Sequence, residues 1–336
     1  MYRIAINGFG RIGKNIARAL LNQSHNKNDI EIVAINDLGC PKIHSHLLKY
    51  DSVHGVIDKS ITSNESSITV DGHEILFLSS NDPSALPWRE LNIDLVLECT
   101  GHFTERDNAA KHINAGAKKV IISAPSPDVE KTIVYGVNHQ ILNSDDVIIS
   151  NASCTTNCLA PIAKVLHETV GIKRGFMTTV HSYTGDQPVL DTMHNDLYRA
   201  RAASLSMIPT TTGAAKAVGL VLPELSGRLD GFAVRVPTPN VSVVDLTFEA
   251  NRDTSITEIN EAVNNVASST LKGVLGYTDK KLVSCDFNHD PRSSIFAADQ
   301  TKVMDKTLVR VLSWYDNEWG FSNRMADTAM VMAKHI

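Results

Sequence analysis

Short apolar segments alternate with helix-like patterns along the first 150 residues. The run Ile4-Ala5-Ile6 is followed by apolar residues at 12, 16, 19 and 20, which share one face of a helix. Further continuous apolar runs lie at 30–35, 95–99, 120–122 and 147–149. Such strands, alternating with helices, are typical of a parallel sheet covered on both faces. The segment 60–78 instead alternates apolar with polar residues, which predicts an inserted hairpin.

After residue 150 the apolar residues recur at every second position. Val244, Leu246 and Phe248 alternate with polar side chains, and the segment 308–314 alternates in the same way. This period favours an antiparallel sheet. Ser255-Ile256-Thr257-Glu258 has the spacing of a capping box, which predicts that a helix begins there. The change of pattern near residue 150 predicts an α/β protein with a parallel-sheet domain followed by an α+β domain with a mainly antiparallel sheet.

Composition places the chain in the class of ordinary globular proteins. Its 336 residues are enough for two domains, and 43% of them are hydrophobic and 21% charged. The net charge of −5 gives no sign of a nucleic-acid surface, and no apolar run approaches the roughly 18 residues of a membrane span. The chain begins in a strand-like pattern without the layout of a signal peptide. We therefore expect a cytoplasmic protein with neither a nucleic acid nor a membrane as partner.

A glycine-rich segment, Asn7 to Gly13 (NGFGRIG), lies between the first strand and the first helix. It contains G-x-G-x-x-G, which is typical either of a tight strand-to-helix turn or of a site where backbone amides bind a pyrophosphate. The next strand ends at Asp37, 24 residues after Gly13. A carboxylate there accepts hydrogen bonds from both ribose hydroxyls of adenosine and repels a 2′-phosphate. The combination predicts a Rossmann-type domain that binds NAD, with contacts from Gly8, Gly10, Arg11, Ile12, Asp37, Thr100, Gly101 and Ser123.

Two of the five cysteines, Cys154 and Cys158, lie close together in the segment SNASCTTNCLAP. An odd number of scattered cysteines argues against a disulfide framework. A zinc site would need further ligands at suitable spacing, and a redox C-x-x-C motif has two intervening residues where this pair has three. If a helix begins near Cys154, its first amides and its dipole favour a thiolate, the form that acts as a nucleophile. Cys158, one turn later, is expected to pack in the interior.

A thiolate needs a partner base, and the segment 176–181 predicts a strand that ends at His181. An imidazole at that position is able to hold Cys154 as thiolate and to move protons. Histidines at strand ends are more often structural, and the chain has thirteen of them. The residues alone therefore do not choose His181 firmly.

The segment SCTTNC at 153–158, taken with HSYT at 181–184, closely resembles the phosphorylating, glycolytic glyceraldehyde-3-phosphate dehydrogenase family. The opening NGFGRIG matches the family as well. Later segments that match are RARAA at 199–203, TGAAK at 212–216, RVPTPN at 235–240 and WYDNEWG at 314–320.

The resemblance implies a reaction and a role for each matched residue. Cys154, assisted by His181, would attack the aldehyde of D-glyceraldehyde 3-phosphate to form a thiohemiacetal, and oxidation by NAD would leave a thioester. Inorganic phosphate would then release 1,3-bisphosphoglycerate, a step of glycolysis and gluconeogenesis. The implied substrate-phosphate ligands are Thr184, Arg199 and Arg235, and those of the attacking phosphate are Ser153, Thr155, Thr212 and Gly213. Asn317 would bind the nicotinamide carboxamide.

The resemblance also implies the domain limits and the assembly. The NAD-binding domain would span 1–151 and be joined by the C-terminal helix at 317–336, the catalytic domain would span 152–316, and the chain would form a homotetramer. Two positions depart from the family pattern: Asn81 stands where many relatives carry Arg or Lys, and Thr192-Met193 replaces a Leu-Pro pair common in strictly NAD-using members.

Two alternatives remain for the function. Erythrose-4-phosphate dehydrogenase shares the nucleophile segment, but 181–187 and 212–215 resemble the glycolytic branch. A binding or adhesion protein that has kept the fold without the chemistry is the second alternative, and the retained catalytic residues argue against it.

Overall fold

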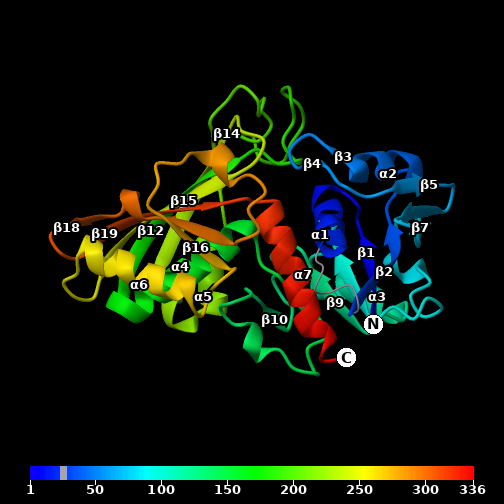
Figure 1. Cartoon of the computed structure of the whole chain (residues 1–336), viewed down its shortest axis with the longest axis horizontal. Coiled ribbons are helices and arrows are strands. Elements are labelled where there is room, and N and C mark those ends of the chain that lie inside the picture. Colours follow the sequence, from blue (N-terminus) through cyan, green and yellow to red (C-terminus); the bar gives the residue numbers. More distant parts are fainter. Residues whose placement is uncertain (23–28) are drawn as a thin grey trace. The chain divides into compact units, whose positions relative to one another are not determined.

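The computed structural model describes residues 1–22 and 29–336, which form two compact units. The first unit comprises Met1–Ile133, His139–Ala152 and Ser322–Ile336, and the second comprises Val134–Asn138 and Ser153–Phe321. Figure 1 shows the helices and strands of both units, coloured along the chain. Helix α7 (Trp319–Ala333) begins in the second unit, and most of it belongs to the first. The helix thus begins two residues after the expected start at 317.

The first unit is built on a sheet in which the described residues form nine strands, in the order β10-β11-β9-β8-β1-β2-β7-β6-β5. Strand β1 pairs in parallel with β2 and β8, and β9 pairs in parallel with β8 and β11. The predicted parallel sheet is therefore confirmed. The strands are β1 (Tyr2–Asn7), β2 (Ile30–Asn36), β5 (Ile61–Ser63), β6 (Ser67–Val70), β7 (His73–Leu78), β8 (Leu95–Glu98), β9 (Lys119–Ile122), β10 (Lys131–Thr132) and β11 (Ile148–Ser150).

The alternating segment 60–78 does more than form a hairpin. Strand β6 pairs antiparallel with β5 and with β7, as the pattern predicts. Strand β7 also pairs in parallel with β2, so the segment extends the main sheet. The alternation predicted the hairpin but did not show which strand edge it joins.

The helices of the first unit bury the apolar strands. Helix α1 (Arg11–Asn22) follows β1, α2 (Pro41–Lys49) follows β2, and α3 (Arg106–Asn114) packs against β9 (Figure 1). One core cluster joins fully buried side chains from β1, β8, β9 and α3, namely Ala5, Val96, Val120 and Ala109, with Trp88. A short antiparallel pair, β3 (Tyr50–Asp51) and β4 (Gly55–Val56), follows α2.

The second unit contains a sheet to which the described residues contribute eight strands. Seven follow the order β13-β14-β12-β15-β19-β17-β16, and β18 pairs with β19. Pairing is antiparallel except between β12 and β14 and between β16 and β17, so the sheet is mainly antiparallel as predicted. The strands are β12 (Ile172–Ser182), β13 (Ile208–Thr211), β14 (Leu229–Val236), β15 (Ser242–Ala250), β16 (Leu275–Thr278), β17 (Ser294–Ala297), β18 (Lys302–Met304) and β19 (Leu308–Tyr315).

Three helices pack on this second sheet. Helix α4 (Cys154–Val170) contacts β12, β15, β17 and β19, while α5 (Ala214–Val221) contacts β14 and α6 (Ile256–Ser268) contacts β16 (Figure 1). Along β12 the side chains of Met177, Thr179 and His181 are buried, whereas Phe176 is 52% exposed. Because strand side chains alternate between faces, this register places His181 on the buried side of the sheet.

The capping box predicted at Ser255 is only half formed. Ser255 Oγ accepts a hydrogen bond from the amide of Glu258 at 3.1 Å, which confirms the helix start. The Glu258 carboxylate binds Arg252 and Thr254 and does not return to the Ser255 amide, because a guanidinium is the stronger partner. Across residues 1–22 and 29–336, the structure has no helix long and apolar enough to span a membrane.

Candidate active site

The first turn of helix α4 places Cys154 where the sequence predicts it. Ser153 has extended dihedrals, and its Oγ accepts a hydrogen bond from the Thr156 amide at 3.1 Å, so Ser153 is the N-cap and Cys154 the first helical residue. The preceding Ala152 has a φ of 58°, a left-handed conformation that costs a non-glycine residue about 1–3 kcal/mol. The partly exposed Cys154 thus lies at the positive end of the helix. Cys158 is fully buried, and its sulfur contacts Ser294 Oγ at 3.5 Å.

The end of strand β12 brings His181 to Cys154. His181 Nε2 lies 3.5 Å from Cys154 Sγ, and His181 Nδ1 lies 2.7 Å from the carbonyl oxygen of Ser182. A carbonyl only accepts hydrogen bonds, so Nδ1 carries the proton of the neutral ring. The lone pair of Nε2 is therefore directed at the thiol, which is the arrangement a general base requires.

Burial and a nearby guanidinium set the charges of this pair. Burial, with Arg235 adding to it, lowers the pKa of His181 to about 3. Burial raises the pKa of Cys154, although Arg235 and the hydrogen bonds of Thr155 oppose this effect. Each of the two shifts favours the neutral form, the thiol of Cys154 and the uncharged imidazole of His181. The charged pair is therefore stabilised only when the proton moves from Cys154 to His181, with Arg235 stabilising the thiolate.

Three predicted phosphate ligands lie together around Asp186. Arg235 Nη1 donates to Thr184 Oγ1 at 2.8 Å and to the carbonyl of Ser182 at 3.1 Å. Thr184 donates to Asp186, and Arg199 Nη1 donates to the same carboxylate at 3.0 Å. Arg235 Nε is buried and has no partner among the described residues. A buried donor of this kind, beside a second guanidinium, suits an anionic ligand.

The other four predicted phosphate ligands are more dispersed. Ser153 caps helix α4, and Thr155 Oγ1 is buried at 2.8 Å from Tyr315 Oη. Thr212 Oγ1 accepts from the amide of Ala214 at the start of α5, and Gly213 has open space where a side chain would point. In the part of the chain that the structure describes, no hydrogen bond joins Thr212 or Gly213 to the Cys154–His181 pair.

The glycine-rich turn between β1 and α1 has the shape that a dinucleotide needs. Gly8 has a φ of 89°, and a Cβ there would lie 2.6 Å from the amide nitrogen of Thr100. A Cβ on Gly13 would lie 2.2 Å from the carbonyl oxygen of Gly8, whereas Gly10 faces open space. These are the three roles of the motif: a tight turn, an open approach for a pyrophosphate, and close packing of helix on strand.

A groove of about 450 Å³ opens at the carboxyl ends of β1, β2 and β8. Four predicted cofactor residues line it, together with Asn81: Gly8, Gly10, Asp37 and Thr100. Five others are not on its lining: Arg11, Ile12, Gly101 and Ser123 of the first unit, and Asn317 of the second.

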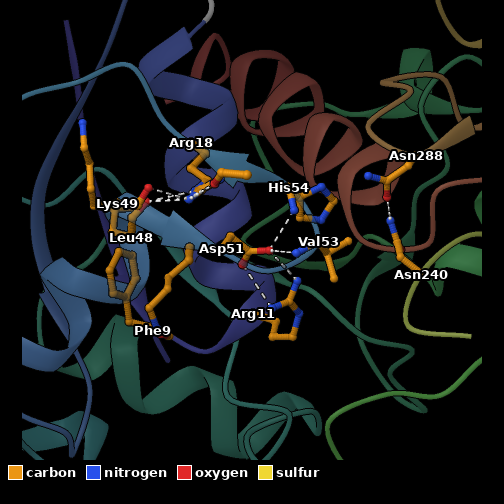
Figure 2. A network of polar contacts seen from close by, with 12 residues as sticks. Phe9, Arg11, Arg18, Leu48, Lys49, Asp51, Val53, His54, Asn240 and Asn288 are labelled. Atoms are coloured by element: carbon orange, nitrogen blue, oxygen red, sulfur yellow. Dashed lines mark hydrogen bonds and ion pairs between the residues drawn. The ribbon is translucent and has the colours of Figure 1, made fainter. Parts of the chain in front are cut away.

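Arg11 binds a carboxylate of the protein itself. Figure 2 shows its guanidinium beside Asp51, with Nη–Oδ distances of 3.1 and 3.2 Å, and the amides of Val53 and His54 donate to the same carboxylate. Although burial opposes ionisation, the His54 amide and Arg11 lower the pKa of Asp51 to about 2. Arg11 therefore fixes the loop after α2 as well as lying next to the glycine-rich turn.

A buried polar network beneath the groove was not predicted from the sequence. Glu98 is 1% exposed and accepts from Asn7 Nδ2 at 2.5 Å and from the amide of Thr100 at 2.8 Å. His112 Nδ1 accepts from Trp88 Nε1 at 2.9 Å, so its Nε2 carries the proton and faces Glu98 Oε2 at 3.1 Å. The network orients the groove residues Asn7 and Thr100. The only sequence signal for it was a polar residue at the end of each of two apolar strands, Asn7 in β1 and Glu98 in β8.

Asn317 belongs to the second unit, where two hydroxyls fix its amide. Ser182 Oγ and Ser242 Oγ each donate to Asn317 Oδ1 at 2.9 Å. Its carbonyl is thus occupied, which leaves the amide NH₂ as the end able to donate elsewhere. Among residues 1–22 and 29–336, no three His, Cys, Asp or Glu side chains cluster closely enough to hold a metal ion.

Comparison with known proteins decides the family. Residues 2–106 match the model described as "Glyceraldehyde 3-phosphate dehydrogenase, NAD binding domain", and residues 153–317 match the model of the C-terminal domain. The chain belongs to the glyceraldehyde-3-phosphate dehydrogenase family. It is 61% identical over 332 residues to glyceraldehyde-3-phosphate dehydrogenases of Cereibacter sphaeroides and Xanthobacter flavus, covering 99% of this chain and 98% of each relative.

A relative from Geobacillus stearothermophilus is 55% identical, with 98% of each chain covered. Membership of the glyceraldehyde-3-phosphate dehydrogenase family makes this chain an NAD-dependent oxidoreductase, and the glycine turn and the groove fit that cofactor.

Proposed function

We propose that the chain oxidises D-glyceraldehyde 3-phosphate to 1,3-bisphosphoglycerate with NAD and inorganic phosphate. The observation that carries the proposal is the 3.5 Å contact between Cys154 Sγ and the unprotonated Nε2 of His181. A thiol beside a base suits covalent catalysis on an aldehyde. Arg235, which favours the Cys154 thiolate, also binds Thr184 in the cluster of predicted phosphate ligands, and this suits an aldehyde that carries a phosphate.

Cys154 and His181 carry the covalent steps. His181 Nε2 takes the thiol proton as Cys154 attacks the aldehyde carbon, and the first amides of α4 are donors for the oxygen that becomes negative. His181 then passes this proton to the oxygen, which gives the thiohemiacetal hydroxyl, and takes it back when the thiohemiacetal is oxidised to a thioester. Inorganic phosphate then attacks the thioester, and Cys154 leaves as thiolate, a form that Arg235 supports.

The first unit supplies the cofactor site. When bound, NAD accepts the hydride that the thiohemiacetal loses. Gly8 and Gly10 would hold its pyrophosphate, Asp37 its adenosine ribose, and Thr100 would line the path between them. Asn317 would donate its amide NH₂ to the nicotinamide carboxamide. Arg11, Ile12, Gly101 and Ser123 complete the proposed set.

Two groups of residues would bind phosphate. Thr184, Arg199 and Arg235 would bind the phosphate of the substrate, because two guanidinium groups match its charge and its oxygen geometry. The attacking phosphate would use hydroxyl and amide donors from Ser153, Thr155, Thr212 and Gly213. These donors add no charge, which suits an anion that must bind and then react.

Exposed apolar side chains support self-association, which we propose gives a homotetramer. On the outer side of the second sheet Phe176 and Phe232 are 52% and 39% exposed, with ring centroids 6.0 Å apart. The loop after β12 exposes seven more large apolar side chains: Val189, Leu190, Met193, Leu197, Tyr198, Leu205 and Met207. Apolar surface of this extent marks an interface in a folded protein.

We also propose that the protein is cytoplasmic and that the two parts of the chain have separate roles. All five cysteines are free, which is typical of a reducing compartment such as the cytoplasm. We assign residues 1–151 with the C-terminal helix to NAD binding and 152–316 to catalysis.

A comparison of two substrates tests the reaction. Initial rates of NAD reduction would be measured with glyceraldehyde 3-phosphate and with erythrose 4-phosphate, each with and without inorganic phosphate. We expect phosphate-dependent oxidation of the three-carbon substrate to be the faster reaction. Phosphate-independent oxidation of the four-carbon sugar as the preferred reaction would reject the proposal in favour of erythrose-4-phosphate dehydrogenase.

The Cys154→Ser variant tests the nucleophile. We expect it to lose oxidation and to retain NAD binding, while Cys158→Ser, one turn further along α4, stays active. Retained turnover in Cys154→Ser would remove Cys154 from its role and would favour a binding protein without this chemistry.

A further inference from the structure

Two basic side chains, Lys14 and His44, form a buried chain of contacts that ends at Asp37. Lys14 comes from α1 and is 7% exposed, and His44 comes from α2 and is 8% exposed. Asp37 lines the groove, whereas neither basic residue does. The mechanism described above uses neither of them.

The hydrogen bonds among these residues donate from Lys14 to His44 and from His44 to Asp37. Lys14 Nζ lies 3.0 Å from His44 Nδ1 and also donates to the carbonyl of Phe9. His44 Nε2 lies 3.1 Å from Asp37 Oδ1. An ammonium group only donates, so His44 Nδ1 must accept, and the proton of the neutral ring must be on Nε2. His44 therefore donates to Asp37, and Lys14 fixes the tautomer that allows it.

Protonation states at neutral pH agree with this direction. Burial lowers the pKa of Lys14 to about 8, so at pH 7 most of the amine is still an ammonium. Burial, with Lys14 adding to it, lowers the pKa of His44, so the ring is neutral. Burial raises the pKa of Asp37, but the amides of Gly39 and Phe9, together with His44 and Lys14, outweigh it, so the pKa is lowered and the carboxylate is charged.

Three protein donors occupy the Asp37 carboxylate. The Phe9 amide donates to Oδ2 at 2.7 Å, and the Gly39 amide and His44 Nε2 lie 3.0 and 3.1 Å from Oδ1. An ionised carboxylate offers about four lone-pair sites. Asp37 is therefore held rigidly and keeps lone-pair capacity for a donor in the groove.

The position of the His44 ring leaves no room for a side chain at residue 39. A Cβ on Gly39 would lie 2.3 Å from His44 Nε2, so the imidazole occupies the space of a side chain at position 39. The ring is also packed between Phe9 and Phe77, with centroid distances of 5.8 and 5.3 Å. His44 thus has one position, and in that position it reaches Asp37.

We propose that Lys14 and His44 are positioning residues for cofactor choice: they hold Asp37 in the orientation in which it binds an adenosine ribose hydroxyl. The proposal rests on the assignment of Asp37 to the ribose. NAD, which has a free 2′-hydroxyl, gains from the oriented carboxylate, whereas NADP has no hydroxyl there and gains nothing. Loss of the orientation should therefore weaken NAD binding and leave NADP binding nearly unchanged.

The test is the ratio of dissociation constants for NADP and NAD, measured by calorimetric titration of the full chain at pH 7. Asp37→Asn should lower the ratio and serves as the reference. His44→Leu should lower it about ten- to a hundredfold, the net effect of one hydrogen bond to a charged group. Lys14→Met should act in the same direction. His44→Gln should keep the wild-type ratio, because a glutamine amide both accepts from Lys14 and donates to Asp37.

Two controls separate positioning from a general loss of structure. His46→Leu replaces an exposed histidine of the same helix and should leave the ratio unchanged. In the Asp37→Asn background, His44→Leu should have no further effect on the ratio. If His44→Leu weakens NAD and NADP equally, its role is only structural and the inference is wrong. If Asp37→Asn itself leaves the ratio unchanged, the assignment of Asp37 in the proposed function fails instead.

Discussion

Replacing His181 by asparagine removes the base that faces Cys154. In the reaction the thiol proton moves to Nε2, and an imidazolium and a thiolate then lie about 3.5 Å apart. Their attraction is about 5 kcal/mol at an effective dielectric constant of 20 and about 1 kcal/mol in water. A partly exposed site lies between these limits. We expect kcat to fall about a hundredfold to a thousandfold, within the usual range for a general base.

Two measurements on the His181→Asn variant test this reasoning. Turnover reports the whole cycle, and the rate at which iodoacetamide alkylates Cys154 at pH 7, followed by mass spectrometry, reports the thiolate alone. Both should fall, while the matched variant His46→Asn should change neither. Unchanged alkylation together with reduced turnover would show that His181 acts only after the attack. Unchanged alkylation and turnover would refute the pairing altogether.

Three further perturbations have expected outcomes. Arg199→Ala should raise KM for the aldehyde phosphate about ten- to a hundredfold with a smaller change in kcat, as initial rates would show, because a charged hydrogen bond is lost. Gly8→Ala should weaken NAD binding and lower the melting temperature, because its Cβ would meet Thr100 in a left-handed backbone. The His54 amide, with Arg11 and the Val53 amide, lowers the pKa of Asp51 to about 2, so these contacts together add roughly 2 kcal/mol to the free energy of unfolding above pH 4, which is lost as pH falls toward 2. Urea unfolding of Asp51→Asn should accordingly show a smaller loss of stability between pH 5 and pH 2 than the wild type.

Local patterns in the sequence predicted much of the fold. Continuous apolar runs predicted the parallel strands, because burial on both faces leaves no room for polar residues. A helix start near Cys154 was a supposition from the sequence, and the structure supplies its cause, the N-cap hydrogen bond of Ser153. The position of β7 beside β2 could not be predicted, because a hairpin pattern carries no information about the edge it joins.

The site was predicted less completely from the residues alone. The resemblance, and not the local pattern, selected His181 among thirteen histidines. Glu98 and His44 were missed because each depends on contacts between distant segments: Glu98 with Asn7, and His44 with Asp37 and Lys14. The position of Asp37 at a strand end was predicted, but which of its lone pairs stay free depends on Gly39 and Phe9, whose amides a sequence pattern does not place.

The course of the chain has a consequence for its synthesis. Helix α7 contributes Met325 and Ala329, which are fully buried, and Thr328 Oγ1 donates to Asn151 Oδ1 at 2.8 Å within the first unit. Almost the whole chain must leave the ribosome before these contacts form. The nucleotide-binding unit is therefore begun first and completed last during synthesis.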